Sequence, residues 1–283
     1  MKRIIALVAF VCFACTAFAQ KHENSLLWKI EGNGLKKPSY LFGTVHMICA
    51  DNFVMPEKVV KAMDQTTQSF LEIDLDSPDF AVESAKHVKS DKPISEQVSA
   101  KDAAYIDSVL KVKVGAGLAQ LDSIKPMALM SALMQKDFTC QMISFEQEVI
   151  KHSAKNKKET HGLSSVEEQF SFMNKIVPAK EFALVIRELN KFNISDMLAG
   201  LYANYKIEDI TAINKMMEGL GTANAEAYHY LLTVRNNLWV DRLPKIMKEQ
   251  PTFIAIGSAH LSGHTGMIKL LQDKGYKVTP VFN

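Results

Sequence analysis

Two short stretches of the sequence decide the fold: Leu41-Phe42-Gly43-Thr44-Val45-His46 near the beginning of the chain and Ile256-Gly257-Ser258-Ala259-His260-Leu261 near its end. Each stretch closes an apolar run typical of a buried strand, and each precedes a segment with helical spacing and then another strand. The same unit, a strand, Gly-x-x-His, a helix and a strand, therefore occurs twice. Ligands of α/β proteins bind at the carboxyl ends of the strands. If the two units pair as neighbours in one sheet, His46 and His260 meet in a single crevice at that edge.

Gly43 and Gly257 stand where the two apolar strands end. A glycine at such a position lets the backbone turn sharply or approach a ligand closely, because it has no Cβ atom. We therefore expect both glycines to serve as backbone positions of the site. A long insertion between two halves of a site costs little loop-closure entropy, so the separation of His46 from His260 along the chain does not prevent this arrangement.

The rest of the chain shows where the sheet and the helices are expected. Apolar runs bounded by glycine and proline predict strands at residues 25–30, 39–45, 69–75, 252–256 and 276–281. Apolar residues spaced three and four apart predict helices at residues 56–65 and 266–274, and a helical insert at about residues 79–249. The predicted fold class is α/β, or α+β, with a mixed central sheet formed from the two ends of the chain and a large helical insert.

One acidic side chain follows the first unit closely in the sequence. In Phe70-Leu71-Glu72-Ile73-Asp74-Leu75, apolar and acidic residues alternate, so Glu72 and Asp74 share one face of a predicted strand. A strand flanked by helices has little free face, and a carboxylate there tends to lie at a crevice or to be paired. The second unit has no acidic counterpart, because no acid follows residue 273. The predicted site is therefore asymmetric and consists of His46, Glu72 and His260.

Two imidazoles and one carboxylate form a common catalytic metal set, in which three protein ligands leave one position open for water. A divalent ion in this set, such as Zn, Mn or Co, lowers the pKa of the bound water and polarises a scissile carbonyl. The same residues also allow a reaction without metal, in which a histidine base is oriented by Glu72 and the other imidazole stabilises developing charge. The sequence leaves both mechanisms open.

The first 19 residues have the form of a secretory signal peptide. Lys2 and Arg3 precede an apolar run at residues 4–18 that ends in Ala17-Phe18-Ala19, which gives a charged start, an apolar middle and a small-residue cleavage site. We therefore expect residues 1–19 to be removed and residues 20–283 to form one exported domain, periplasmic or secreted. No later apolar segment reaches the roughly 20 residues that a membrane-spanning helix needs, so no stable membrane span is expected after cleavage.

The charge balance limits the classes of partner that the protein can bind, and the cysteine count limits the disulfides that it can form. The chain has 33 basic and 31 acidic residues, and Lys2 and Arg3 lie in the signal, so the mature chain is formally neutral. Such a balance excludes the strongly basic footprint of a nucleic-acid-binding protein. Cys12 and Cys15 also lie in the signal, which leaves Cys49 and Cys140. An even pair in an exported chain predicts either one disulfide or two buried thiols.

The residues of both units, together with the Glu72 strand, resemble the TraB/GumN family, which also includes the Tiki proteins. The resemblance covers nearly the whole mature chain and extends to Ser144-Phe145-Glu146, Gly162-Leu163, residues 166–169, Arg235-Asn236 and Gly275-Tyr276. One step departs from the family pattern, because Ser164-Ser165 stand where many relatives have Glu-Thr.

The resemblance implies a fold related to the erythromycin esterases and to haem-binding ChaN-like proteins. Tiki members of the family are metal-dependent proteases. The resemblance therefore implies His46, Glu72 and His260 as candidate metal-binding or catalytic residues. It implies that Gly43 and Gly257 contribute backbone positions and that Arg235 makes a polar contact near the site. Asp74 is also expected near the site, because it shares a strand face with Glu72.

Three functions follow from these features. The first is an exported metal-dependent hydrolase, a peptidase acting on a peptide or protein substrate. The second is a non-catalytic envelope protein that sequesters a peptide or a haem-like ligand in the same crevice. The third is a structural envelope protein whose histidines only brace their loops. The sequence contains neither a Gly-x-Ser-x-Gly elbow nor a phosphate-binding glycine loop, which disfavours a serine hydrolase or a nucleotide enzyme.

Overall fold

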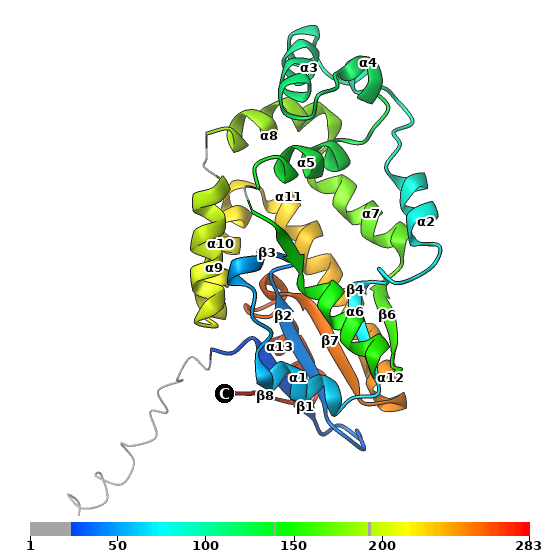
Figure 1. The fold of residues 1–283 in the computed structure, drawn as a ribbon, viewed down its shortest axis with the longest axis vertical. Helices are drawn as coiled ribbons and strands as arrows, with labels where there is room; N and C mark the ends of the chain where they lie inside the picture. The colour runs from blue at the N-terminus through cyan, green and yellow to red at the C-terminus, as the bar shows by residue number, and fades with distance from the viewer. Residues whose placement is uncertain (1–23, 139, 192–193) are drawn as a thin grey trace, which may run out of the picture.

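The computed structural model describes residues 24–138, 140–191 and 194–283 of the chain, so the predicted signal peptide lies outside the described residues. A six-stranded sheet, in the order β6-β4-β7-β2-β1-β8, occupies the lower half of Figure 1. Within the described part of the chain, no helix combines the length and the apolar character needed to cross a bilayer. The strands are β1 (Leu27–Glu31), β2 (Ser39–Thr44), β3 (Met47–Cys49), β4 (Gln68–Ile73), β5 (Met142–Ser144), β6 (Glu159–Ser164), β7 (Thr252–Gly257) and β8 (Lys277–Pro280).

The two Gly-x-x-His units are direct neighbours in the sheet. β2 pairs with β7 in parallel, with Gly43 opposite Ile256 and Thr44 opposite Gly257. β4 pairs in parallel with the other edge of β7, whereas β1 pairs antiparallel with both of its neighbours, β2 and β8. The prediction of a mixed α/β fold, whose sheet joins the two ends of the chain around a large helical insert, is confirmed. Because β4, β7 and β2 are parallel, their carboxyl ends meet at one edge.

The burial of β2 and β7 explains why these two strands lie at the centre. All six residues of each strand are buried. A parallel strand covered on both faces is a nearly continuous apolar run instead of an alternating one. Phe42 and Phe253 belong to these runs, and their ring centres lie 6.1 Å apart in the core.

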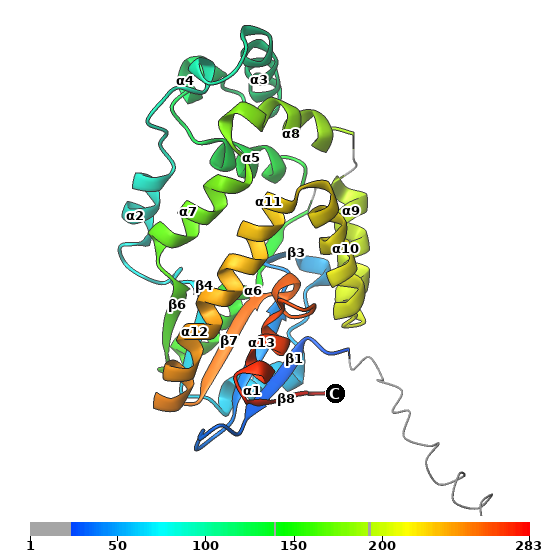
Figure 2. The ribbon, with the colours of Figure 1, turned by 180° about the vertical axis from the view of Figure 1, so that it is seen from behind.

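Helices cover both faces of the sheet. α1 (Glu57–Asp64) and α6 (Phe145–Lys155) lie in front of it in Figure 1, whereas α12 (Val234–Glu249) and α13 (Met267–Asp273) lie in front in the reverse view of Figure 2. α1 begins directly after Pro56, because proline fits the start of a helix, where its missing N–H would be unpaired. The apolar sides of these helices, with residues such as Val59, Val149 and Leu271, complete the core around the sheet.

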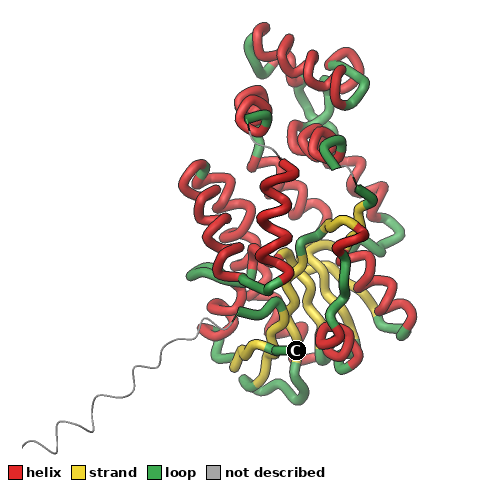
Figure 3. Tube along the Cα trace, turned by 60° about the vertical axis from the view of Figure 1, so that its left-hand side comes forward, coloured by secondary structure: helices red, strands yellow, loops and turns green. Residues whose placement is uncertain are grey.

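The insert has a second hydrophobic core of its own. Ile106, Leu110, Leu133 and Phe182 belong to this core, which is separate from the cluster around the sheet. In Figure 3 the red helices of the insert extend well beyond the yellow sheet. These helices are α2 (Phe80–His87), α3 (Ala100–Lys113), α4 (Leu118–Leu121), α5 (Pro126–Gln135), α7 (Val166–Ile176), α8 (Phe182–Leu189), α9 (Ile194–Lys206), α10 (Ile210–Ala223) and α11 (Ala225–Tyr228).

The insert also contains two strands that the sequence pattern does not predict. β6 forms the edge of the central sheet beside β4, and β5 pairs with β3 in a separate two-stranded ribbon. In β6 only Leu163 and Ser164 are buried, so this edge strand lacks the apolar alternation by which a strand is recognised. β3 and β5 have three residues each, too few for any periodic pattern.

Candidate active site

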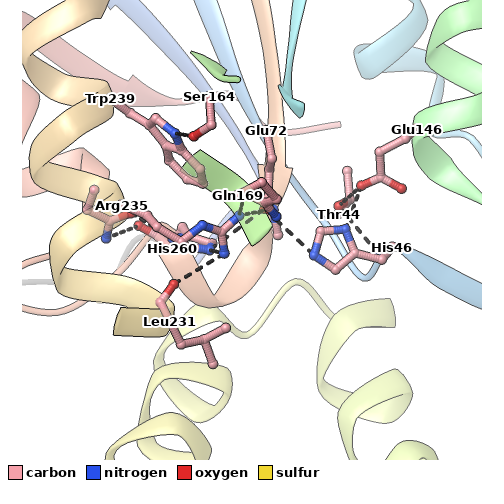
Figure 4. A network of polar contacts seen from close by, with 12 residues as sticks. Thr44, His46, Glu72, Glu146, Ser164, Gln169, Leu231, Arg235, Trp239 and His260 are labelled. Carbon is pink, nitrogen blue, oxygen red and sulfur yellow. Dashed lines mark hydrogen bonds and ion pairs between the residues drawn. The ribbon is translucent and has the colours of Figure 1, made fainter. Parts of the chain in front are cut away.

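The three predicted side chains come from three neighbouring strands. His46 follows β2, Glu72 lies on β4, and His260 ends the 3-10 turn Ser258–His260 after β7, the strand between the other two. His46 Nε2 lies 3.6 Å from Glu72 Oε1, and His260 Nε2 lies 3.7 Å from the same oxygen. Figure 4 shows this convergence. The structure therefore brings the three residues together around one carboxylate oxygen.

Gly257 and Gly43 permit this convergence because neither position has room for a Cβ atom. A Cβ on Gly257 would lie 2.9 Å from His46 Nε2 and 3.3 Å from Glu72 Oε1, and one on Gly43 would lie 2.6 Å from Leu261 Cδ1. The Gly257 N–H also donates to Glu72 Oε1 at 2.7 Å. Both glycines thus act through close approach of the backbone to its neighbours.

His46 is the accessible member of the site, with 53% of its side chain exposed. Its φ of 55° lies in the left-handed region, which costs a non-glycine residue roughly 1 kcal/mol. Ring atom Nδ1 lies 2.8 Å from Glu146 Oε1, which also accepts from Thr44 Oγ1 at 2.7 Å. Desolvation lowers the pKa of His46, but the charge of Glu72 and the hydrogen bond and charge of Glu146 outweigh it and raise the pKa to about 9. His46 therefore carries two ring protons at neutral pH.

His260 is the buried member, with only 3% of its side chain exposed. Its Nδ1 lies 2.7 Å from Asn236 Oδ1, and its Nε2 lies 3.2 Å from Arg235 Nη1. Because a guanidinium only donates hydrogen bonds, Nε2 accepts from Arg235 and the ring hydrogen lies on Nδ1. Burial lowers the pKa of His260 to about 3, since the opposing attraction of Glu72 is weaker. The two histidines at this site therefore differ in charge.

Glu72 and Arg235 form a buried ion pair between the two histidines. Arg235 Nη2 donates to Glu72 Oε2, and only 3% of the Arg235 side chain and 7% of the Glu72 side chain are exposed. Burial alone would raise the pKa of Glu72, but the positive charge of Arg235, helped by the histidines and the Gly257 N–H, holds that pKa well below its usual range. Glu72 is therefore a carboxylate at any physiological pH.

Arg235 is the second residue of α12, the helix that directly follows the π-helical segment His229–Thr233. π-helical turns occur frequently at functional sites. Arg235 Nη1 donates to Leu231 O of that segment at 3.2 Å, and Nη2 donates to Gln169 Oε1 of α7 at 3.1 Å. The insert thus contributes a side chain to the network, and the guanidinium is fixed from several directions.

The two Gly-x-x-His units, the Glu72 strand and the insert all fall within one family match. A comparison with protein-family models matches residues 26–280 to the TraB/PrgY/gumN family. The chain belongs to this family. Comparisons with curated proteins and with solved structures found no match.

The resemblance to TraB/PrgY/gumN proteins implies a metal on His46, Glu72 and His260, and the observed contacts test that set. Both Nε2 atoms lie 3.6 to 3.7 Å from Glu72 Oε1, a spacing compatible with ligands of one ion at about 2.0 to 2.2 Å. However, Arg235 already bonds His260 Nε2 and Glu72 Oε2, and a cation there repels another. Among the described residues, no three His, Cys, Asp or Glu side chains are arranged to hold a metal ion. Arg235 therefore competes with a metal ion for two of the three predicted ligands, and metal binding by His46, Glu72 and His260 stays a prediction.

The sequence did not predict three residues of this hydrogen-bond network as part of the site. They are Glu146 beside His46, Gln169 beside Arg235, and Asn236 beside His260. They stand in segments that carry the family resemblance, but no spacing relates them to the histidines. Asp74, expected beside Glu72, has a different contact. Its Oδ1 accepts from the Asp76 N–H at 3.1 Å, in the turn that follows β4.

Ser164 and Ser165, which replace the Glu-Thr pair of many TraB/PrgY/gumN relatives, have structural contacts. Ser164 Oγ accepts from Trp239 Nε1 at 2.8 Å, and the Trp239 ring lies 4.7 Å from that of His260, centre to centre. Ser165 caps α7, because its Oγ accepts from the Glu168 N–H and its own N–H donates to Glu168 Oε2. At positions 164 and 165 the chain therefore has two hydroxyl groups, which support neighbouring elements of the site by hydrogen bonds, where many relatives have an acid.

Proposed function

We propose that this protein is an exported hydrolase that cleaves peptide bonds, in which His46 takes the proton of an attacking water. The setting of His46 carries the proposal. Its imidazole is half-exposed at the carboxyl edge of the sheet, and Glu146 holds Nδ1 at 2.8 Å. An imidazole whose Nδ1 is held by a carboxylate is well suited to general-base catalysis through Nε2.

The reaction needs the neutral form of His46, which has a lone pair on Nε2. Nε2 takes a proton from water while the water oxygen bonds to the substrate carbonyl carbon. The imidazolium then returns that proton to the leaving amine nitrogen as the C–N bond breaks. Glu146 keeps the other ring hydrogen on Nδ1 and stabilises the charged ring between the two steps. Because the pKa of His46 is raised to about 9, we expect cleavage to be faster in alkaline solution.

Arg235 and its partners hold the Glu72 carboxylate in place beside His46. The guanidinium is buried and donates to Glu72, Gln169 and Leu231 O. This ion pair fixes the Glu72 carboxylate 3.6 Å from His46 Nε2, where a preorganised negative charge stabilises the imidazolium that forms when the water proton is taken. Neutral His260 supports the guanidinium by accepting from Nη1, a role that only an unprotonated Nε2 can perform.

Metal-dependent cleavage is the competing version of this proposal. An ion such as Zn, Mn or Co on His46, Glu72 and His260 would supply a Lewis acid and a more acidic water. In the observed arrangement, however, Arg235 occupies His260 Nε2. The two versions differ in the effect of a chelator: only metal-dependent cleavage is abolished by it.

Export and substrate class are also proposed. Residues 1–19 have the form of a signal peptide, and a disulfide joins Cys49 to Cys140, as expected in the periplasm or outside the cell. The choice of a peptide or protein substrate rests on the resemblance to metal-dependent proteases. No charge pattern of the mature chain suggests a different partner.

The test is a cleavage assay on purified residues 20–283 with a defined peptide mixture, read by mass spectrometry. We compare the wild type with His46→Gln and with Glu148→Gln, a control that changes a carboxylate of α6 paired with Lys151 on the helix surface. New peptide termini are expected from the wild type and from Glu148→Gln but not from His46→Gln. Equal cleavage by His46→Gln rejects the proposal. Peptide or haem bound but recovered unchanged supports the sequestering protein instead, and an unfolded His46→Gln variant supports a bracing role.

A further inference from the structure

We infer that the Cys49–Cys140 disulfide positions His46 against Glu146, and that a dithiol reductant disables the site by opening it. The inference deepens the proposed function and rests on it only for the loss of activity. Its structural part, the loosening of one ribbon, stands on contacts that do not depend on catalysis.

The disulfide and the His46–Glu146 pair lie at opposite ends of the β3–β5 ribbon. β3 begins directly after His46, and β5 ends at Ser144, two residues before Glu146; Met47 lies opposite Ser144. At this end the Phe145 N–H donates to His46 O at 3.0 Å. At the other end Cys49 lies opposite Met142, and the Ala50 N–H donates to Gln141 O at 2.8 Å, beside the disulfide.

The ribbon has no turn of its own. Its two strands are far apart in the sequence, since β4 and the helices α2 to α5 lie between them along the chain. The disulfide joins these two parts of the chain across a sequence separation of 91 residues. In a β-hairpin a short turn would connect the strands at the end where Cys49 and Cys140 are bonded. The disulfide therefore takes the place of that turn.

A ribbon of this size needs such a link. Two antiparallel strands of three residues each are marginal in water without further support. His46, moreover, holds a left-handed backbone conformation, with φ 55°, which persists only where surrounding contacts determine it. If the link is lost, we expect the Phe145 to His46 hydrogen bond to open and the imidazole to leave Glu146.

The far side of β3 has an independent support, so the loosening should stay local. The Tyr202 hydroxyl of α9 donates to Met47 O of β3 at 2.9 Å, and the Tyr205 hydroxyl donates to Gly43 O of the neighbouring β2 at 2.9 Å. The central strands β2 and β7 are paired and buried without any contribution from the disulfide. Reduction should therefore release the ribbon without unfolding the sheet.

A reductant can reach the disulfide. Both cysteines are partly exposed, and both line an open cavity of about 410 Å³ between the ribbon and α9, together with Phe138, Met142 and Tyr202. A thiolate of a dithiol attacks one sulfur, the S–S bond breaks, and a mixed disulfide forms. The second thiol of the reductant then attacks it, which leaves two cysteine thiols and an oxidised reductant after transfer of two electrons and two protons.

The experiment measures hydrogen exchange by NMR on residues 20–283, oxidised and after dithiothreitol, and on the Cys49→Ala/Cys140→Ala variant. The backbone N–H of Phe145 reports the ribbon, and that of Ile254 in β7 reports the core. We expect exchange at Phe145 to rise about tenfold or more, since a local opening becomes easier, while exchange at Ile254 is unchanged. The signal of the hydrogen-bonded His46 Nδ1–H should broaden or disappear in the reduced protein and in the variant.

Cleavage is measured on the same samples. We expect reduction to lower it about tenfold or more in the wild type and reoxidation to restore it, while the double variant is slow and insensitive to dithiothreitol. Unchanged exchange at Phe145, or faster exchange at Ile254 as well, overturns the inference, because the disulfide would then be dispensable or a staple of the whole fold. If reduction loosens the ribbon but neither the oxidised nor the reduced protein cleaves peptides, the proposed function is refuted. The role of the disulfide in positioning His46 against Glu146 then still holds.

Discussion

His46 Nδ1 lies 2.8 Å from Glu146 Oε1, although 100 residues separate the two along the chain. The contact joins the loop after β2 to the first turn of α6, and it leaves the imidazole half-exposed. A second carboxylate, Glu72, lies 3.6 Å from the other ring nitrogen. One accessible imidazole between two carboxylates distinguishes this edge of the sheet from an ordinary loop.

Glu146→Gln should shift the pH dependence of cleavage to lower pH. Loss of the carboxylate removes a negative charge and a hydrogen bond that raise the pKa of His46, so the neutral imidazole forms at lower pH. The maximal kcat/KM should also fall about 10²- to 10⁴-fold, because the ring hydrogen is no longer held on Nδ1. The check is kcat/KM against pH, with Glu148→Gln as the control. An unshifted profile would show that Glu146 does not act on His46.

Arg235→Met should destabilise the protein by about 3 to 5 kcal/mol, because it leaves the buried Glu72 carboxylate without its cation. Glu72→Met strands the guanidinium in the same way. The double variant should be less destabilised than the sum of the two single ones, which urea unfolding measures. Glu57→Gln breaks an exposed pair with Lys61 and should change nothing measurable. Strict additivity of the two core variants would contradict the buried pair.

His260 should make the protein less stable as the pH falls from 7 to 5. In the folded protein the pKa of His260 is about 3, below its ordinary value of 6.5. Below pH 6.5 the His260 imidazole therefore binds a proton in the unfolded chain but stays neutral in the folded one. Between pH 7 and pH 5 the free energy of unfolding should fall by about 2 kcal/mol because of His260. His46, with a raised pKa, acts in the opposite direction, so the comparison is made between wild type and His260→Gln by urea unfolding. Equal pH dependence in both proteins would show that His260 is not held neutral.

Gly257→Ala should impair cleavage while the sheet stays folded. The added Cβ would lie 2.9 Å from His46 Nε2, and the half-exposed ring has room to swing away from Glu72. A displacement of this kind costs about 10²-fold in kcat/KM. Gly219→Ala is the control, because no described residue outside its own helix backbone lies within 4 Å of a Cβ there. Circular dichroism checks the fold, and full activity of Gly257→Ala would contradict the close approach.

The centre of the fold could be predicted because its signals are local and duplicated. The apolar runs that end in Gly43 and Gly257 are buried strands, and their common ending predicted a shared site on the condition that the two strands were neighbours, which β2 and β7 are. Glu72 could be chosen because it interrupts an apolar strand that follows the first unit. Its position on β4, beside β7, brings it to both histidines.

The remaining parts of the site depend on tertiary contacts that leave no periodic trace. Glu146 is an ordinary acid in the first turn of a helix until the β3–β5 ribbon places it beside His46. Gln169 reaches Arg235 only because β6, an edge strand without an apolar pattern, sets where α7 begins. Arg235 itself was expected only as a polar contact, whereas the structure places it between Glu72 and His260.

The most direct test of the account is the pH dependence of kcat/KM for peptide cleavage, measured across about pH 6 to 10 before and after metals are removed by chelation. With His46 as the general base, kcat/KM should rise about tenfold per pH unit and level off near the pKa of about 9. The profile should be the same with and without the chelator. Activity that disappears on chelation and returns with Zn, Mn or Co would contradict this account and establish the metal-dependent mechanism.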